Sequence, residues 1–375
     1  MMAVIDQPKT TYSDTTTHKR AIGDVMNMID PRDTPLVAIL GLDSARTKFK
    51  IFENSTKIEL LEDELDPLST TANQGTTITT TTLSITVTDG SVFQDGHVIK
   101  LDSEYMVVSA VSSEVITVES RSYGGTNATH VAGVTIDIVG MARLEGDDTD
   151  YGPIVDITAP YNYTSIFQKG IKITGTQEKM SQYGIDNEFA YQADKQIPHL
   201  LRLVERMFFY GIRAVGTATT RRSAGGLGVY ITDNTVAAGG TITKADVDGL
   251  AEKVYMDGGN PNILVVHPGV ANDLRGLIDT SSFVRVGQEN TVLGMMDLKT
   301  LNTQYGPLGL VMDRHAPVAF AWMLDTTKVG VYTYRPFTWK RLGLTGDNLK
   351  GEVVGEFSLL VANDKAHGKV QTITS

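Results

Sequence analysis

Apolar and polar residues follow several different patterns along the chain, and each pattern predicts a different kind of structure. Residues 1–20 are polar, rich in threonine and without periodicity, which is typical of an arm that is ordered by contact with something else. Four apolar residues then recur at helical spacing: Ile22, Val25, Met26 and Ile29. We expect Pro31 and Pro35 to end this short helix, and we expect the alternating residues 48–52 to form an extended strand.

The next part of the chain predicts a small all-β domain. Eight of the thirteen residues from Thr70 to Thr82 are threonine, whose branched Cβ favours strands over helices. Five short apolar runs follow, separated by Gly, Asp, Asn and Ser: Val92, 98–99, 105–108, 115–118 and 134–138. This spacing is typical of a barrel or sandwich, which we place at 75–140 between two extended segments, 46–66 and 141–175.

A long amphipathic helix opens the second half of the chain. Its apolar residues recur at steps of three and four: Ile197, Leu200, Leu201, Val204, Met207, Phe208 and Ile212. The pattern predicts a helix from Asp186 to Val215, about 45 Å long, with a kink or a join at Pro198. The glycine-rich residues 225–228 are interpreted as a flexible hinge. An α/β pattern follows: a helix at Lys244–Met256, a buried strand at Ile263–Val266, a helix at Pro268–Ile278, strands at 308–334 and a β-rich tail at 335–374.

Charge is distributed unevenly along the 375 residues. The chain contains 44 acidic and 33 basic residues, a net charge of −11, and 17 acids against 7 bases lie between Arg46 and Asp150. This imbalance indicates a module that faces solvent and repels polyanions, which argues against a general nucleic-acid binder. The absence of cysteine excludes disulfides and thiol chemistry. We find no secretory signal and no apolar run long enough for a membrane span, and we expect an intracellular product.

The sequence contains no recognisable catalytic or metal-binding motif. The seven histidines form no HxH or HExxH pair, so a zinc site would need an unmarked constellation. The acidic residues 145–150 lack the ligand spacing of a calcium loop and are better explained as a solvated turn. Gly225–Gly228 follows no strand and lacks the Lys and Ser/Thr of a phosphate-binding loop. We therefore expect a protein that is not an enzyme and has no cofactor.

Several short motifs follow one another along the chain, and two of them have a local structural explanation. They are Ile29–Leu36 (IDPRDTPL), Arg121–Thr126 (RSYGGT), Ala142–Asp147 (ARLEGD), Asn162–Gln168 (NYTSIFQ) and Ile173–Thr176 (ITGT), followed by Glu205 and Gly211. Asp-Thr-Pro is expected to end a helix, and Tyr-Gly-Gly-Thr is expected to form a tight turn with positive φ. In this order the motifs resemble those of the major capsid proteins of tailed bacteriophages, in the branch with a β-domain inserted in the extended loop.

The resemblance implies an α+β fold of the Hong Kong 97 type, with a small all-β barrel or sandwich inserted. The implied parts are an N-terminal arm and short helix (1–44), an extended loop (45–74 and 141–175), the inserted β-domain on the outer surface (75–140), a spine helix with the peripheral domain (176–229), an axial domain (230–334) and a C-terminal β part (335–375). The implied function is to form a virion shell, built from hexamers and pentamers of this chain, around double-stranded DNA. The resemblance also implies that the protein is made in the bacterial cytoplasm and does not bind a membrane.

The contacts between subunits are expected to be electrostatic in part. We expect an acidic segment of one subunit to meet basic residues around the spine helix of its neighbour, with packaged DNA as the alternative partner of the basic residues. The acidic set is Glu59, Glu62, Asp63, Glu64 and Asp66. The basic set is Arg202, Arg206, Arg213, Arg221 and Arg222. Solvated surface charge is the alternative for both sets, because exposed ion pairs contribute only about 0–1 kcal/mol each.

Further partners and competing functions complete the expectations. The Asp-Thr-Pro motif begins only 32 residues into the chain, which leaves no room for a long built-in scaffolding segment and favours a separate scaffolding protein. The resemblance also implies a portal and a decoration or cement protein. The alternatives are an encapsulin-like cargo shell, a virion fibre or carbohydrate-binding β-protein, and an acidic glycosidase with paired carboxylates.

Overall fold

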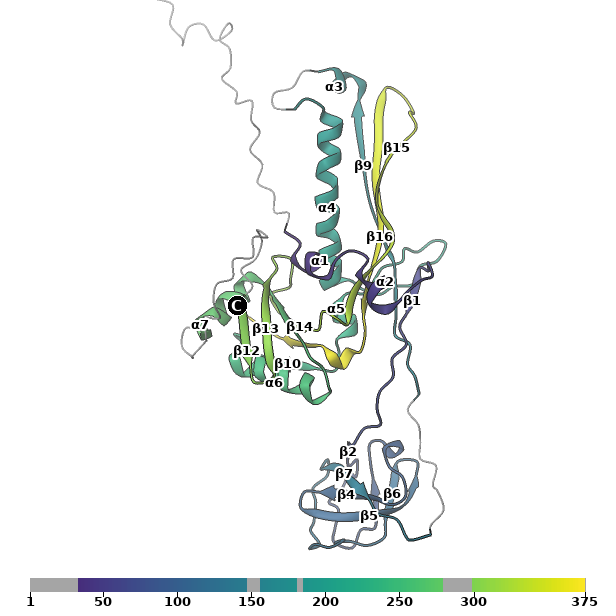
Figure 1. Ribbon diagram of the computed structural model, residues 1–375, viewed down its shortest axis with the longest axis vertical. Helices are drawn as coiled ribbons and strands as arrows, with labels where there is room; N and C mark the ends of the chain where they lie inside the picture. The colour runs from purple at the N-terminus through teal and green to yellow at the C-terminus, as the bar shows by residue number, and fades with distance from the viewer. Residues whose placement is uncertain (1–32, 147–155, 181–184, 279–298, 375) are drawn as a thin grey trace, which may run out of the picture. The chain divides into compact units, whose positions relative to one another are not determined.

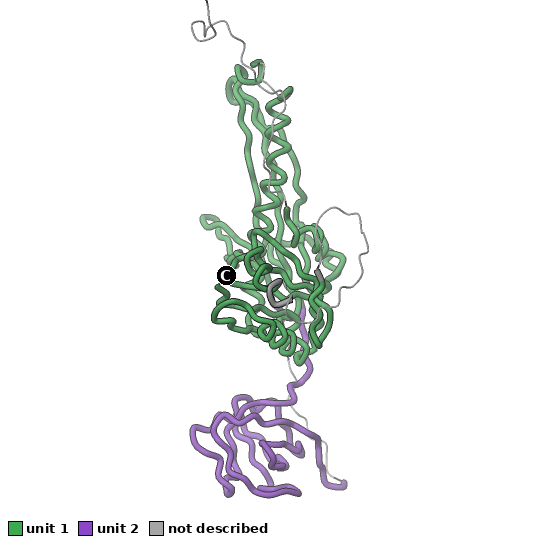
Figure 2. The backbone as a smooth tube through the Cα atoms, turned by 90° about the vertical axis from the view of Figure 1, so that its left-hand side faces the viewer, with its two compact units in different colours: residues 1–60, 161–375 green, residues 61–160 purple. Residues whose placement is uncertain are grey.

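The structure, a computed structural model, describes residues 33–146, 156–180, 185–278 and 299–374. The chain divides into two compact units (Figure 2): unit 1 contains residues 1–60 and 161–375, and unit 2 contains residues 61–160. Unit 2 is therefore an insertion in the sequence of unit 1. The helix expected at 22–29 lies outside the described residues.

Helix α1 (Pro35–Leu40) begins at a proline that we expected to end a helix. Proline suits the first turn of a helix because its missing N–H would have no partner there and its φ is already helical. Leu36, Val37 and Leu40 then point into the core and are buried. The Asp-Thr-Pro motif thus starts a helix.

Helix α2 (Ser44–Phe49) contains the first two residues of the strand expected at 48–52, and residues 50–52 form a turn and irregular backbone, so that prediction is wrong. The helix lies beside the outer edge of strand β15 (Val329–Arg341) and covers the first part of this edge with side chains. Asp43, which precedes the helix, accepts a hydrogen bond from Thr333 N at 3.2 Å, and Ser44 Oγ accepts one from Val331 N at 3.0 Å. Arg46 donates to Thr333 O at 3.1 Å, and Lys48 donates to Val329 O at 2.7 Å. These partners are distant in sequence, so the local alternation of apolar residues could not reveal them.

A three-stranded antiparallel sheet in the order β15-β16-β9 extends along helix α4 (Figure 1). Strand β9 (Ser165–Thr174) pairs with β16 (Asn348–Val361), and the short helix α3 (Gly175–Lys179) follows β9. Phe189 of α4 contacts Trp339 of β15 edge to face, with ring centroids 5.4 Å apart. Only glycine fits beneath them, because a Cβ at Gly351 would lie 2.4 Å from the Trp339 ring.

Helix α4 (Glu188–Tyr210) is one continuous helix of 23 residues, shorter at both ends than the predicted range of 186–215. Asn187 caps it by accepting a hydrogen bond from Ala190 N at 3.1 Å. Pro198 lies inside the helix and is not a join between two segments. Leu200, Val204 and Phe208 are buried along one face, as their spacing predicted.

A mixed six-stranded sheet forms the other half of unit 1, in the order β10-β17-β14-β11-β13-β12. Its strands are β10 (Thr235–Ala237), β11 (Ile263–Val266), β12 (Lys299–Thr303), β13 (Gly306–Met312), β14 (Ala321–Leu324) and β17 (Gly368–Gln371). The β10/β17 and β11/β13 pairs are parallel, and the other pairs are antiparallel. Helices α6 (Lys244–Met256) and α7 (Pro268–Ile278) confirm the predicted boundaries, as β11 does.

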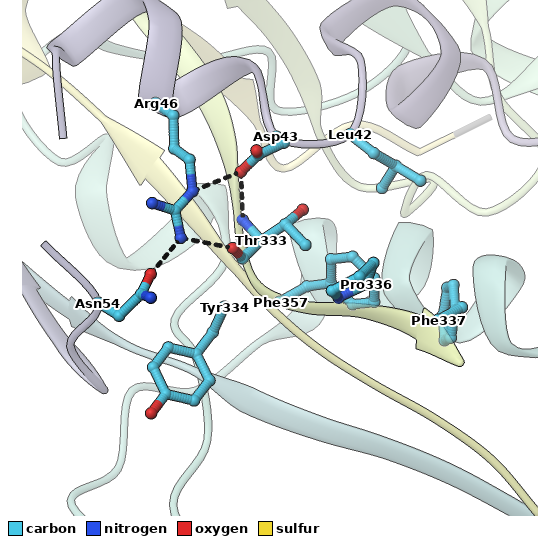
Figure 3. A pocket seen from close by; sticks show the side chains of 9 residues that line it. All are labelled: Leu42, Asp43, Arg46, Asn54, Thr333, Tyr334, Pro336, Phe337 and Phe357. Atoms are coloured by element: carbon cyan, nitrogen blue, oxygen red, sulfur yellow. Dashed lines mark hydrogen bonds and ion pairs between the residues drawn. The ribbon is translucent and has the colours of Figure 1, made fainter. Parts of the chain in front are cut away.

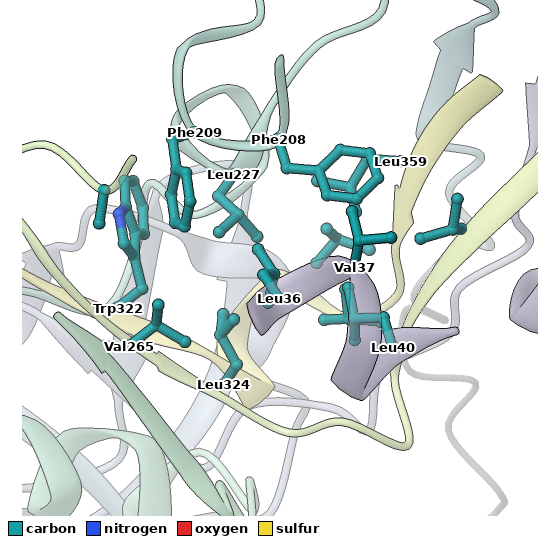
Figure 4. Packing of buried hydrophobic residues seen from close by; sticks show 14 of the residues in the cluster. Leu36, Val37, Leu40, Phe208, Phe209, Leu227, Val265, Trp322, Leu324 and Leu359 are labelled. Carbon is teal, nitrogen blue, oxygen red and sulfur yellow. The ribbon is translucent and has the colours of Figure 1, made fainter. Parts of the chain in front are cut away.

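Both faces of this sheet are buried, which explains the uninterrupted apolar sequence of β11. On one face, Ile263 and Val265 contribute to a core with Trp322, residues of α1 and the end of α4 (Figure 4). The short helix α5 (Leu227–Tyr230) adds Leu227 to this core. On the other face, residues of β11, α6 and α7 form a second core: Leu264, Val266, Val247, Leu250, Val270 and Leu274.

Unit 2 is an all-β fold built around one antiparallel sheet in the order β2-β7-β4-β5-β6-β3. The strands are β2 (Ser69–Thr71), β3 (Ser84–Thr86), β4 (His97–Leu101), β5 (Glu104–Ser112), β6 (Val115–Val118) and β7 (Thr135–Met141). Four of the five predicted apolar runs are strands, whereas Val92 lies in the 3₁₀ helix η1 (Gly90–Val92). The threonines at 79–82 form a turn in which the Thr79 hydroxyl bonds to the hydroxyls of Thr81 and Thr82.

The sheet of unit 2 includes β2, which lies before the start of the expected β-domain at residue 75. Residues 61–160 contain 16 acids and 3 bases, a net charge of −13, so the acidity of the whole chain is concentrated in this unit. In unit 1, β1 (Lys57–Glu59) and β8 (Tyr161–Tyr163) pair antiparallel next to the points where unit 2 begins and ends. The 3₁₀ helix η2 (Asp364–Ala366) precedes β17.

Candidate functional site

The predicted arginines have different environments, and two of them are engaged within their own subunit. Arg222 forms an ion pair with Glu356, whose carboxylate is 1% exposed. Arg213 lies 4.4 Å from the centroid of the Tyr161 ring and donates to Tyr161 O at 2.9 Å. Both arginines therefore stabilise the fold of unit 1, which leaves them less suited to a partner.

The other three arginines remain candidates to different degrees. Arg206 is exposed on α4 and lies 5.5 Å from the Tyr210 ring centroid, and Arg221 is exposed without a hydrogen bond or ion pair to another described residue. Arg202 is half-buried, and its Nε is buried without a hydrogen-bond partner in the described part of the chain. Arg206 and Arg221 are thus the arginines of this set that are most available for an external contact.

The predicted acidic residues belong to two different units. Glu59 lies in β1 of unit 1, forms an ion pair with Lys57 and pairs in register with Tyr161. Glu62, Asp63, Glu64 and Asp66 belong to unit 2. Glu62 forms an isolated antiparallel bridge with Thr158. Asp63, Glu64 and Asp66 are exposed. The structure brings Glu59 near Arg213 through the shared Tyr161.

The motif at 162–168 forms a joint between segments that are far apart in the sequence. Asn162 is fully buried and makes four hydrogen bonds: Nδ2 donates to Gly225 O at 3.0 Å and Leu359 O at 2.6 Å, and Oδ1 accepts from Gly225 N and Tyr163 N at 2.8 Å. Ser165 Oγ accepts from Ala224 N at 2.7 Å. These bonds hold the glycine-rich segment in place, and Gly225 and Gly226 are buried, so its interpretation as a flexible hinge is wrong.

A buried carboxylate completes this joint. Glu356 of β16 accepts a hydrogen bond from Thr164 Oγ1 at 2.5 Å and from Arg335 Nε at 3.0 Å, in addition to its ion pair with Arg222. A buried carboxylate requires such partners, because an unpaired charge away from water is strongly unfavourable. The sequence motif thus marks the junction at which β9, β16 and the 222–226 segment are locked together.

Glu205 of α4 anchors the N-terminal helix α1. Its side chain is fully buried, and its two carboxyl oxygens accept hydrogen bonds from Leu36 N at 2.7 Å and Val37 N at 2.8 Å. These amides belong to the first turn of α1, which has no side-chain cap of its own. Glu205 therefore supplies from another helix the acceptors that this helix end lacks.

The electrostatic environment of Glu205 makes it a neutral acid at neutral pH. Burial and, after it, the hydrogen-bonding and repulsive effects of Asp313 raise the pKa of Glu205 to about 9, against the opposing effect of the Val37 and Leu36 amides. Asp313 is itself buried, and its Oδ1 accepts from His315 N at 2.7 Å. The motif analysis singled out Glu205 through a family resemblance, but its role depends on contacts 168 and 169 residues away.

Gly211 ends α4 at a point where two backbone segments touch. Its N–H donates to Met207 O at 2.8 Å, its C=O accepts from Gly226 N at 2.9 Å, and a Cβ there would lie 2.5 Å from Met207 O and 2.6 Å from Ala224 O. We predict that Gly211→Ala destabilises unit 1 by about 1–3 kcal/mol, because backbone atoms must move apart. Thermal unfolding followed by tryptophan fluorescence measures this loss.

The matched control for this prediction is Gly249→Ala in α6, where a Cβ would meet no atom within 4 Å. Alanine loses less backbone entropy than glycine in a helix, so this variant is expected to gain about 0.5–1 kcal/mol. A Gly211→Ala protein that is as stable as the control would contradict the close approach.

Unit 2 contains a buried polar network around Glu104. Arg121 forms two hydrogen bonds with this carboxylate, at 2.8 Å and 2.7 Å, and His130 Nε2 lies 2.9 Å from it. His130 Nδ1 lies 2.7 Å from Asp102, and Ala128 N donates to Glu104 at 3.0 Å. Burial would raise the pKa of Glu104, but the bonds from Arg121, Ala128 and His130 outweigh it and lower the pKa to about 2.

The network explains the Arg121–Thr126 motif in structural terms. Arg121 also donates to backbone carbonyls of the threonine-rich turn, Thr79 and Thr82, and to Ala128 O. Gly124 has a φ of +70°, as the predicted turn requires. The arrangement resembles an Asp-His-Glu constellation, but its members bond to one another and line neither of two pockets of about 470 and 450 Å³ in unit 1, so it serves the fold.

Two further observations concern metal ligands and long apolar helices. Nowhere in the described ranges do three His, Asp or Glu side chains gather as a metal site would need. Within the same ranges, no helix is long and apolar enough to cross a membrane. The acidic turn at 145–150 lies mostly outside the described residues.

Comparison with solved structures shows which fold the chain has. The capsid protein of cyanophage A-1(L) superposes with a TM-score of 0.54 at 13% identity, over 98% of this chain and 100% of that chain. Solved structures of Mycobacterium phage Adephagia (13% identity, 98% and 99% covered) and Mycobacterium phage Cain (13% identity, 98% and 99% covered) give TM-scores of 0.49 and 0.48. The fold is that of the Hong Kong 97-type capsid proteins.

The particular family follows from the sequence match. The family model of the SU10 major capsid protein matches residues 9–374, and the chain belongs to this family. A search of the curated proteins found no match. The protein is therefore a phage major capsid protein, a structural component of the virion shell that associates with copies of itself.

Proposed function

We propose that this capsid protein assembles as hexamers and pentamers into an icosahedral shell that encloses double-stranded DNA. The family match across residues 9–374 carries this proposal, and the sheet of β9, β15 and β16 along α4 supports it. A capsid protein of this kind is made in the host cytoplasm and needs no catalytic residue. Binding to the enclosed DNA requires charge complementarity but no sequence recognition.

The same proposal assigns each segment of the chain to a part of the capsid subunit. Residues 176–229 contribute to the peripheral domain, residues 230–334 form the axial domain around the symmetry axes, and residues 335–375 contribute strands to both. Unit 2, with a net charge of −13, belongs on the outer surface, because an acidic module facing the interior would repel DNA. Residues 45–74 and 141–175 act as the extended loop that carries it.

The acidic segment of one subunit, with Glu62, Asp63, Glu64 and Asp66, is proposed to meet the exposed arginines of its neighbour, Arg206 and Arg221. Arg213 and Arg222 are weaker candidates for this contact, because they already have partners inside their own subunit. Each exposed pair contributes only about 0–1 kcal/mol, so the contact acts through several pairs and weakens with salt.

Charge reversal tests this contact. We predict that the triple variant Glu62→Lys, Asp63→Lys and Glu64→Lys assembles poorly, and that Arg206→Glu with Arg221→Glu in the same chain restores shells measured by gradient sedimentation. The control reverses Asp89, Glu114 and Glu119, which are exposed in unit 2 and change the net charge equally. Normal assembly of the first triple variant would disprove the pairing.

Assembly itself is tested by mass. Negative-stain microscopy and mass photometry of the chain, alone and with its neighbouring genes, are expected to show closed shells or ring-shaped capsomers of megadalton mass. Shells that appear only with a neighbouring gene would identify the separate scaffolding protein that we propose. A portal and a decoration protein are further proposed partners. Small uniform particles under every condition would overturn the shell function.

A further inference from the structure

A pocket of about 470 Å³ lies in unit 1 between the α2 region and strands β15 and β16 (Figure 3). Its apolar walls come from Leu42, Pro336, Phe337 and Phe357, and the Phe337 and Phe357 rings are 4.7 Å apart. It opens where the side chains of α2 stop covering the edge of β15, at Thr333. The pocket is therefore an apolar recess beside a strand edge.

The polar end of the pocket is rigidly built. Arg46 donates through Nε to Asp43 at 3.1 Å and through Nη2 to Asn54 at 2.5 Å and Thr333 O at 3.1 Å, while its guanidinium lies 4.9 Å from the Tyr332 ring centroid. Nη1 of Arg46 donates no hydrogen bond to the described residues. Thr333 is 8% exposed, and its Oγ1 is buried without a partner in the described chain. A donor and a hydroxyl group thus remain free at this end.

A projecting aromatic side chain lies next to the pocket. Phe52 is 84% exposed and precedes the pocket residue Asn54 by two positions, which places their Cα atoms within about 7 Å of each other. The loop that carries Phe52 is held in place, because the buried Tyr332 hydroxyl bonds to Glu53 O at 3.4 Å and Ser55 N at 3.3 Å. Phe52 is thus held out in solvent by an ordered backbone.

We propose that Phe52 and Glu53 of one copy of this chain occupy this pocket in a second copy. The chemistry of the two partners matches, since an aromatic ring followed by a carboxylate meets apolar walls that end in Arg46. Because projection and pocket are neighbours on one surface, a twofold operation lets each subunit fill the pocket of the other. The contact deepens the proposed shell function and depends on it.

The absence of cysteine in the chain allows a selective test. Two single-cysteine proteins, one with Phe52→Cys and one with Leu42→Cys, are mixed under assembly conditions and treated with mild oxidant or a short bismaleimide. We expect a covalent dimer of twice the chain mass that contains one chain of each kind, identified by isotope labelling of one population. A mixture of Phe52→Cys with Val131→Cys, a 71% exposed position in unit 2, is expected to give at least tenfold less dimer.

A second measurement addresses the energetics of the contact. Phe52→Asp is expected to raise the concentration needed for assembly at least tenfold, whereas Phe52→Leu stays within threefold of the parent and Val131→Asp is unchanged. If the parent chain forms shells but the mixed dimer is absent and Phe52→Asp assembles normally, the contact is wrong and the shell function stands. If the parent chain never assembles, the shell function fails and the contact fails with it.

Discussion

Glu205→Ala is expected to lower the free energy of unfolding by about 3 kcal/mol or more, because it leaves the amides of Leu36 and Val37 buried without acceptors. Each buried group without a partner costs about 1–3 kcal/mol, and the lost side chain also leaves a cavity. Urea unfolding measures the loss. Hydrogen exchange at the two amides is expected to become much faster, since helix α1 loses its attachment to α4.

Glu205→Gln is the control that separates this role from simple packing. Because the raised pKa keeps Glu205 neutral at pH 7, glutamine preserves both shape and charge and sacrifices one acceptor. We expect a loss of about 1 kcal/mol for this variant. Equal losses for alanine and glutamine would contradict a neutral carboxyl at this position.

The pH dependence has a defined sign. The pKa of Glu205 is raised in the folded chain from its ordinary value of 4.5 to about 9, so the folded state binds the proton more tightly than the unfolded state. The stability that this group contributes is complete below pH 4.5 and is lost as the pH rises through about 9. The decline should be absent in Glu205→Gln.

Arg121→Ala is expected to unfold unit 2 selectively, with a loss of about 3–5 kcal/mol, because it leaves the buried Glu104 carboxylate without its main partner. Arg143→Ala is the matched control, since Arg143 is an exposed arginine in the same unit and should cost less than about 0.5 kcal/mol. Both tryptophans, Trp322 and Trp339, lie in unit 1, so their fluorescence reports on unit 1 alone.

The measurement therefore combines two probes on the full chain. Hydrogen exchange of peptides from residues 97–141 should show early unfolding of unit 2 in Arg121→Ala, while the tryptophan transition stays unchanged. A variant whose two probes shift together would contradict a role confined to unit 2. In the parent chain, the lowered pKa of Glu104 predicts stability that is present above pH 4.5 and is lost as the pH falls toward 2.

Periodicity in the sequence predicted those elements whose partners are mostly local or whose apolar face is continuous. The helix at Lys244–Met256 and the strand at Ile263–Val266 have the predicted boundaries. The strand expected at 48–52 failed because Arg46 and Lys48 bond to the edge of β15, more than 270 residues away. No local pattern contains that information.

The sequence predicted the candidate site less well than it predicted the fold. Charge patterns identified ten residues as possible contacts, but two of the arginines, Arg213 and Arg222, have partners in their own subunit. Among the 44 acidic residues, Glu205 was singled out only through a family resemblance and Glu356 not at all, because the sequence does not show that either is buried. Phe52 ends the alternating residues 48–52, and its projection into solvent depends on the distant Tyr332.

The cover that α2 places over the edge of β15 has a consequence for the kind of polymer this chain forms. An open strand edge adds identical chains one after another without limit, which leads to fibres rather than to a particle of fixed size. Asp43, Ser44, Arg46 and Lys48 occupy the hydrogen-bonding positions that such growth would use. Over this first part of β15, a protein that accumulates to high concentration before it closes into a shell is thereby protected from unlimited strand addition.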